Sequence, residues 1–294
     1  MASTTNRRFA ILVINPNTSK HMTDALSPIV ENLNFSDVQF DYFTAPSESV
    51  TLPDGRTIDG VPSINSGEDS AKSALHCMPF VEPLIPKYDA FLVACYSAHP
   101  LVGMLKKAIA GLDDSALSGD STEPAATRKC VTGIFEASVV TSLSLISSFH
   151  LLGDQEYGKT QAQDTFGIIS TGSVWKEELG KAVAEMLVRS GNATNPTRRF
   201  AGVETTGLTA VELHTTPPAE VKRKISEATE KLIKSTPDPL TAICMGCAGM
   251  AGMEEAVREG CIKAYGPKQA KQVRIVDGVV AGAGLLVTAC KAGF

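Results

Sequence analysis

Two apolar segments that each end on a cysteine constrain the fold more than any other feature of the sequence. The first runs from Tyr88 to Cys95, and the second runs from Leu240 to Cys247. A continuous apolar run of this length, closed by turn residues, is typical of a strand buried on both faces of a parallel sheet. In such sheets the chemistry lies beyond the carboxyl ends of the strands. The sequence therefore predicts two thiols at equivalent strand ends.

The rest of the chain alternates between strand-like and helix-like segments, as expected for an α/β fold. Apolar residues recur at helical spacing from Met22 to Leu33, and Pro28 inside this pattern predicts a kink or a restart of the helix. A further apolar helix is predicted from Val139 to Leu152, and the polar stretch from Asp113 to Arg128 is the best candidate for a linker. Further strands are predicted at Phe9–Ile14, Val38–Phe43, Val131–Phe135, Phe166–Ser170, Phe200–Val203 and Val273–Val276.

The two halves of the sequence share three landmarks in the same order. Phe9-Ala-Ile-Leu matches Phe166-Gly-Ile-Ile, Cys95 matches Cys247, and the strand before Glu136 matches the strand before Asp277. The order predicts a duplication: two pseudo-symmetric lobes, each a parallel sheet flanked by helices, with the active site in the cleft between them. A chain of 294 residues is long enough for about two such domains.

Composition excludes several classes of partner and compartment. The net charge is −5 and there is no basic tract, so we expect neither a nucleic-acid nor a membrane partner. The first apolar run, after Arg8, is too short for a signal-peptide core or a membrane span. Seven cysteines without a regular framework fit reduced thiols, so we expect a cytoplasmic protein.

Two thiols on opposite sides of a carbon acid can racemise it, because one takes the proton as thiolate and the other returns a proton to the opposite face. Thiols suit this task because their unperturbed pKa of about 8.5 lies near working pH and is lowered at helix N-termini. Cys95 and Cys247 each precede a predicted helix. Backbone N–H groups at those helix starts can hold the oxygen of the developing enolate.

Other interpretations of the cysteines remain open. A cysteine in an apolar segment is most often an inert core residue, and we prefer this for Cys77, Cys130, Cys244, Cys261 and Cys290. Cys244 and Cys247 form a Cys-x-x-Cys pair, but the sequence lacks a second such pair, which leaves a zinc site short of ligands. A redox dithiol ranks below racemisation, because Cys244 falls inside the predicted strand whereas a dithiol motif normally opens a helix. His99 can form a nucleophilic pair with Cys95 or have a structural role in its turn.

Several motifs resemble those of the aspartate/glutamate/hydantoin racemase superfamily, and most closely its hydantoin and allantoin racemase branch, in particular the fungal members. They are Ile14-Asn-Pro-Asn-Thr-Ser19, Ala94-Cys95, Gly133-Ile-Phe-Glu-Ala137, Gly246-Cys-Ala-Gly-Met250 and Val276-Asp-Gly278. The resemblance covers nearly the whole chain. One departure stands out: the branch commonly has Asp-Pro shortly after the first cysteine, whereas this chain has His99-Pro100, one residue later.

The resemblance implies a cofactor-independent racemase with no metal, in which Cys95 and Cys247 are the acid/base pair and the substrate is a five-membered cyclic ureide. It implies lobes at 1–110 with 272–294 and at 111–271, and, because family members often assemble, a homo-oligomer. The candidates for holding the ring are Asn15, Ser97, Glu136, Thr171, Ala248 and Gly249.

The expected function is racemisation of allantoin or 5-substituted hydantoins at C5. Two alternatives stay open. One is another reaction of the superfamily, isomerisation or decarboxylation through a single nucleophilic cysteine. The other is a non-catalytic ureide-binding regulator of nitrogen metabolism.

Overall fold

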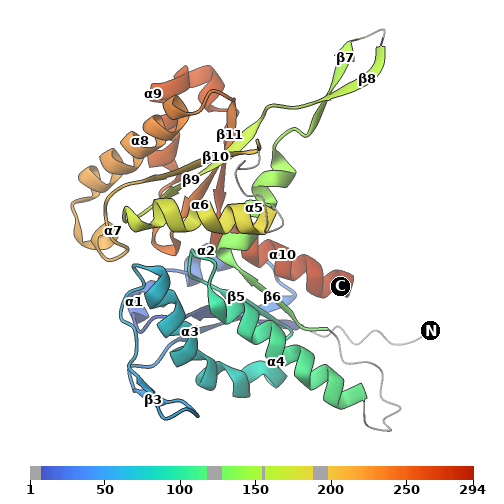
Figure 1. Cartoon of the computed structure of the whole chain (residues 1–294), viewed down its shortest axis with the longest axis vertical. Coiled ribbons are helices and arrows are strands. Elements are labelled where there is room, and N and C mark those ends of the chain that lie inside the picture. The colour runs from blue at the N-terminus through green and yellow to red at the C-terminus, as the bar shows by residue number, and fades with distance from the viewer. Residues whose placement is uncertain (1–7, 118–127, 154–155, 188–197) are drawn as a thin grey trace. The chain divides into compact units, whose positions relative to one another are not determined.

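The two cysteine-terminated segments belong to two separate four-stranded parallel sheets. The structure is a computed structural model that describes residues 8–117, 128–153, 156–187 and 198–294. It divides into unit 1, Met1–Ala137 with Val279–Phe294, and unit 2, Ser138–Gly278. Each unit contains one of the sheets (Figure 1).

The sheet of unit 1 has the strand order β2-β1-β5-β6. All neighbouring strands are parallel. The four residues of β5 are all buried, which explains why the segment before Cys95 is continuously apolar. In contrast, edge strand β2 is mostly half-buried and alternates polar with apolar residues. The strands are β1 (Phe9–Asn15), β2 (Val38–Thr44), β5 (Ala90–Val93) and β6 (Cys130–Gly133).

Helices cover this sheet, and one of them comes from the end of the chain. As predicted, the first helical region is interrupted: α1 ends at Asp24 and a new helix, α2, begins at Ser27 with Pro28 in its first turn, where the missing N–H of proline costs nothing. The C-terminal α10 belongs to unit 1 although it follows a strand of unit 2. The elements are α1 (Lys20–Asp24), α2 (Ser27–Glu31), α3 (Gly67–Val81), η1 (Glu82–Lys87), α4 (Pro100–Leu117), α10 (Gly278–Ala292) and the hairpin of β3 (Val50–Thr51) and β4 (Thr57–Ile58).

The sheet of unit 2 has the order β10-β9-β11-β12 and is also parallel. In chain order, both sheets place their second strand at one edge, their first and third strands in the middle and their fourth strand at the other edge. This shared topology confirms the duplication and the two-lobed α/β fold. The strands are β9 (Thr165–Ser170), β10 (Phe200–Thr205), β11 (Leu240–Gly246) and β12 (Arg274–Asp277).

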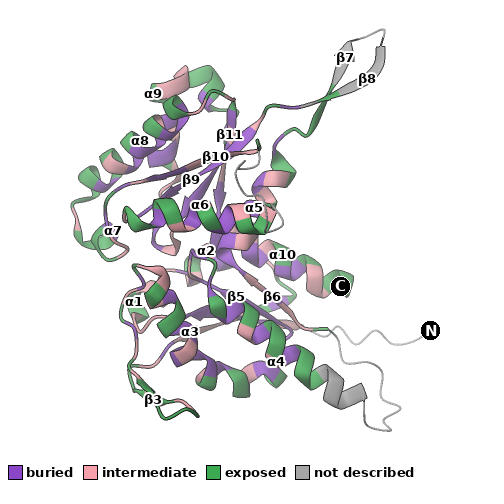
Figure 2. Cartoon of the chain, in the orientation of Figure 1, coloured by how far each residue is buried: buried purple, intermediate pink, exposed green. Residues whose placement is uncertain are grey.

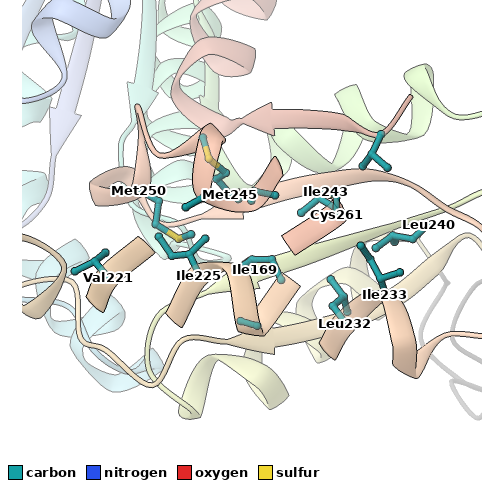
Figure 3. Packing of buried hydrophobic residues seen from close by; sticks show 14 of the residues in the cluster. Ile169, Val221, Ile225, Leu232, Ile233, Leu240, Ile243, Met245, Met250 and Cys261 are labelled. Atoms are coloured by element: carbon teal, nitrogen blue, oxygen red, sulfur yellow. The ribbon is translucent and has the colours of Figure 1, made fainter. Parts of the chain in front are cut away.

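The core of unit 2 lies between this sheet and helices α8 and α9. Ile225 and Leu232 of α8 point toward Ile169 and Ile243 of the sheet (Figure 3). Burial of these side chains is the main source of stability for such a layer. The helical elements are α5 (Ile134–Leu145), α6 (Val174–Leu187), α7 (Glu212–Thr215), α8 (Pro218–Ser235), η2 (Ala248–Met250) and α9 (Glu254–Ala270).

The burial pattern follows the sheets in both units. Central strands are buried along their length, whereas the outer faces of α3, α6, α8 and α9 are exposed (Figure 2). Within the described residues, no helix is both long enough and apolar enough to cross a membrane.

The expected lobe boundaries differ from the observed units in two places. Strand β6 pairs with β5, so unit 1 continues to Ala137 and does not end at residue 110. Strand β12 pairs with β11, so the return to unit 1 begins at Val279 and not at residue 272. In both places the chain leaves a unit only after completing its fourth strand.

The helix predicted from Val139 to Leu152 is too long at its C-terminal end. Helix α5 ends at Leu145, and Phe149–Gly153 forms strand β7 of an antiparallel hairpin with β8 (Glu156–Gln161). An apolar run does not by itself distinguish helix from strand, and here cross-strand pairing decides. Of the predicted linker, residues 113–117 continue α4, and 118–127 lie outside the described residues.

Candidate active site: two strand-end cysteines

Cys95 lies two residues beyond the end of β5, in a loop that leads into α4. It is half-buried. The ring of the next residue, Tyr96, is buried and packs edge-on against Phe135, with 5.6 Å between ring centroids. The loop is therefore anchored by an aromatic contact, and the thiol remains partly accessible at the carboxyl end of the sheet.

Ser97 lies against the Cys95 thiol. Its Oγ is 3.6 Å from Cys95 Sγ, within hydrogen-bond distance for sulfur, and either atom can donate. Ser97 is buried, and its Oγ is also 3.2 Å from Ser70 Oγ on α3. The predicted ring-binding residue Ser97 thus contacts the candidate catalytic thiol itself.

His99 is a buried, neutral member of the same loop. Its Nδ1 accepts a hydrogen bond from the Leu101 N–H at 3.3 Å, so the ring proton is on Nε2, which donates to Ser73 Oγ at 3.0 Å. Burial lowers the pKa of His99 from 6.5 to about 3. These contacts favour the structural interpretation of His99, because both of its ring nitrogens are engaged away from Cys95.

Cys247 occupies the equivalent position in unit 2. It directly follows β11 and caps η2, and its Sγ accepts a hydrogen bond from the Gly249 N–H at 3.3 Å. The preceding residue, Gly246, has no room for a side chain, because a Cβ there would lie 2.8 Å from the Ile169 carbonyl oxygen. The glycine allows β9 and the cysteine turn to approach closely.

The pKa of Cys247 is shifted in the direction opposite to that expected from the sequence, which predicts that a helix N-terminus lowers it. Burial raises the pKa of its thiol to about 11, although the N–H groups of Gly249 and Met250 act in the opposite direction. The helix that follows is a single turn of three residues, so its dipole is too small to outweigh desolvation. Cys247 is therefore a thiol at neutral pH.

Ala248 and Gly249 supply the first amides of η2 beside Cys247, as expected from the sequence. Thr171 follows β9 at the same end of this sheet and is buried. Its carbonyl oxygen accepts hydrogen bonds from the Gly207 N–H at 3.1 Å and from Thr206 Oγ1 at 3.5 Å. The carboxyl edge of the unit 2 sheet thus brings together Thr171 and the Cys247 turn.

Asn15 ends β1 in unit 1, and its side chain makes hydrogen bonds within the turn that follows and to the start of α1. The amide nitrogen lies 3.0 Å from each of Asn17 Oδ1, the Ser19 carbonyl oxygen and Thr23 Oγ1, and the amide oxygen accepts from the Asn17 N–H. These contacts show that Asn15 organises the turn between β1 and α1.

Glu136 lies in the first turn of α5, three residues after β6. Its Oε2 is buried without a hydrogen-bond partner. Burial raises the pKa of this carboxyl group, and backbone hydrogen bonds at Glu136 and Gly133 together with the charge of Lys106 only partly oppose the shift. The side chain packs against Gly133, where a Cβ would displace the carboxylate. A carboxyl group with an unsatisfied oxygen is suited to receive a polar group of a ligand.

The other cysteines have no features of a reactive site. Cys77, Cys244 and Cys261 are buried, and Cys130 and Cys290 are half-buried. Cys244 lies within β11, and its Sγ is 3.0 Å from Ser142 Oγ of α5. In the part of the chain that the structure describes, no group of three or more His, Cys, Asp or Glu side chains is arranged to hold a metal ion.

Sequence reasoning missed Ser70 and Ser73, which connect α3 to the Cys95 loop. Both are buried. A signal was present: two serines at i and i+3 precede Cys77 on the apolar face of α3, and a hydroxyl on a buried helix face needs a partner. The sequence could not show that this partner is the Cys95 loop.

Comparison with known proteins places the chain in a family. The sequence profile of the Asp/Glu/Hydantoin racemase family matches residues 11–286. The protein C1F7.10 of Schizosaccharomyces pombe is 30% identical over 278 residues, covering 95% of this chain and 90% of that protein.

Two solved structures share the fold. Allantoin racemase from Klebsiella pneumoniae matches with a TM-score of 0.66 and 18% identity, over 97% of this chain and 89% of that one. Allantoin racemase from Pseudomonas fluorescens matches with a TM-score of 0.65 and 20% identity, over 97% and 92%. With the family profile spanning nearly the whole sequence, the chain belongs to the Asp/Glu/hydantoin racemase family.

Proposed function

We propose that this chain is a cofactor-independent racemase that acts at C5 of a hydantoin-type ring, with Cys95 and Cys247 as the two acid/base groups. The observation that carries the proposal is the repetition: in a member of this family, the equivalent strands of two duplicated sheets, β5 and β11, each lead into a cysteine turn.

The chemistry needs one thiolate and one thiol on opposite faces of the ring. The thiolate removes the C5 proton, the electron pair moves onto the C4 carbonyl oxygen as an enolate, and the thiol then protonates C5 from the other side. For one enantiomer Cys247, whose pKa burial raises to about 11, donates the proton and Cys95 is the base. The opposite enantiomer requires the reverse assignment.

The ring is held by groups at the carboxyl edges of the sheets. Ala248 and Gly249 are the candidates for holding an oxygen of the ring or its enolate through their backbone amides, and in the structure the Gly249 N–H donates to Cys247 Sγ. Thr171 borders the same turn. Glu136 offers its unsatisfied Oε2 to a ring N–H or, when protonated, donates to a ring carbonyl. Asn15 supports this edge through its turn rather than through the ring.

Allantoin and 5-substituted hydantoins share the ring and the acidic C5–H, so both belong to the proposed substrate class. The fold neighbours named allantoin racemases make allantoin the first compound to test. The departure at His99 lies in a buried structural contact, which does not by itself exclude either substrate.

Polarimetry of purified protein with single enantiomers of allantoin and of several 5-substituted hydantoins tests the proposal. We expect loss of optical rotation with wild-type protein, and a decrease of at least about 10³-fold in Cys95→Ser and in Cys247→Ser, because each removes one of two essential proton carriers. Cys130→Ser is the matched control and should keep the wild-type rate, since the Cys130 thiol donates to the carbonyl oxygens of Arg128 and Phe294.

Full activity in either active-site variant rules out the two-base mechanism. A covalent adduct on Cys95 or Cys247, seen by intact-protein mass spectrometry, supports instead an isomerase or decarboxylase with one nucleophilic cysteine. Tight ureide binding without turnover supports the regulator.

A further inference from the structure

A chain of two serine hydroxyls connects the Cys95 thiol to a backbone carbonyl on α3. Ser97 Oγ lies between Cys95 Sγ, at 3.6 Å, and Ser70 Oγ, at 3.2 Å. Ser70 Oγ in turn lies 3.1 Å from the Ser66 carbonyl oxygen at the start of α3. Each hydroxyl therefore has two neighbours and only one proton to donate.

Proton counting gives this chain one direction when Cys95 is a thiolate. Ser70 Oγ donates to Ser97 Oγ, so the Ser97 proton donates to the sulfur. The Ser66 carbonyl stays satisfied, because it also accepts the Ser70 backbone N–H at 3.0 Å. When Cys95 is a thiol, Ser97 Oγ can accept its S–H.

We propose that Ser70 and Ser97 form a directed hydroxyl relay that stabilises the thiolate of Cys95, in which Ser70 donates to Ser97 and thereby directs the Ser97 proton to the sulfur. No proton passes along the relay. Ser97 and Ser70 are thus positioning residues for Cys95. Their benefit to catalysis rests on the racemase function proposed above, whereas the relay is a property of Cys95 and its neighbours alone.

The neutral imidazole of His99 fixes the geometry of the relay. Its Nε2–H donates to Ser73 Oγ, and Ser73 Oγ donates to the Ser70 carbonyl oxygen at 3.0 Å. The loop that carries Ser97 and the helix that carries Ser70 are thereby joined at a second point. His99, where the chain departs from the family pattern, supplies this connection.

Other ionisable groups on α3 are engaged elsewhere. Asp69 accepts from the Asn65 N–H at 3.0 Å, His76 binds the Glu48 carbonyl oxygen at 2.7 Å, and Lys72 pairs with Glu68. Besides Cys95, the ionisable His99 contacts one of these buried serines, Ser73, and it stays neutral over the pH range of interest. Ser70 is thus the residue of α3 that is connected to Cys95 through Ser97.

The pH dependence of Cys95 alkylation tests the relay without substrate. Iodoacetamide reacts with the thiolate, and peptide mass spectrometry separates Cys95 from the other cysteines. The variants are Ser97→Ala, Ser70→Ala, the double variant and Ser97→Thr, which keeps the hydroxyl. The matched control is Ser226→Ala, which removes a buried hydroxyl that has no hydrogen-bond partner.

We expect the pH midpoint of alkylation to rise by about one unit in Ser97→Ala, because the thiolate loses the hydroxyl of Ser97 as a donor. Ser70→Ala should give about half that rise, since Ser97 loses the group that directs its proton. The double variant should match Ser97→Ala, because Ser70 acts only through Ser97. Ser97→Thr and Ser226→Ala should keep the wild-type midpoint.

A wild-type midpoint in Ser70→Ala, or a shift in the double variant equal to the sum of the two single shifts, overturns the relay. These outcomes do not depend on any substrate. A chain that shows the relay and no racemisation therefore contradicts the proposed function alone.

Discussion

At the scale of single residues, the two candidate catalytic thiols are held by different kinds of donor. Cys247 receives the backbone N–H of Gly249, which cannot change direction. Cys95 contacts the hydroxyl of Ser97, which can donate or accept. The backbone N–H can only donate to the Cys247 sulfur, whereas the hydroxyl can donate to a Cys95 thiolate or accept from a Cys95 thiol. The two donors differ although the two positions are equivalent in the two sheets. Sequence spacing predicted the equivalence of the thiols but not this difference, since the position of the Ser97 hydroxyl depends on its contact with Ser70 of α3.

Because His99 is buried and neutral, we expect the free energy of unfolding of the protein to decrease in acid. Its folded pKa, about 3, lies below its ordinary value of 6.5, so its contribution is fully present above pH 6.5 and is lost as pH falls toward 3. We expect the wild-type free energy of unfolding to fall more steeply over this range than that of His99→Gln, by on the order of a few kcal/mol. Urea denaturation at pH 7, 5 and 4 measures the difference.

The control for this comparison is His21→Gln, because His21 is exposed. It should keep the wild-type slope. If His99→Gln also keeps the full acid dependence, then His99 is not a buried neutral group.

At the scale of elements, α10 depends on one glycine for its contact with the unit 1 sheet. A Cβ at Gly282 would collide with the Leu92 side chain of β5, whereas a Cβ at Gly284, two residues further on, meets nothing within 4 Å. The two glycines therefore form a matched pair in one helix.

We expect Gly282→Ala to lower the free energy of unfolding by about 1–3 kcal/mol through overpacking. Gly284→Ala should raise it by up to about 1 kcal/mol, because alanine is the better helix former. Thermal and urea denaturation of the two variants measures the effect. Equal changes of the same sign would show that α10 does not pack on β5 through Gly282.

Elements with a local cause were predictable, and elements set by pairing were not. Pro28 restarts the first helix, as its missing N–H requires. The apolar run after Leu145 becomes strand β7 because it pairs with β8, which helical periodicity does not reveal. The short polar turns after β1, β5 and β11 were located from sequence because glycine, asparagine and serine mark them.

At the scale of the whole molecule, duplication explains most of what the sequence could predict. The same strand order in both sheets follows from three repeated landmarks. The lobe boundaries were misplaced because each unit keeps its fourth strand, and strand pairing in a sheet is a long-range property. Among the site residues, Cys95 and Cys247 follow directly from the repeat. The buried serines of α3 behind the Cys95 loop do not, because the packing of α3 brings Ser70 to Ser97 and Ser73 to His99.

The position of deuterium after partial turnover in D₂O tests the central claim most directly. One enantiomer of the substrate is incubated with the protein and stopped early, and the two enantiomers are separated and weighed by mass spectrometry. The two-base account predicts deuterium at C5 of the newly formed enantiomer and protium in the recovered starting enantiomer, because removal and return use different thiols. Formation of the product enantiomer without solvent deuterium, or equal early labelling of both enantiomers, would contradict it.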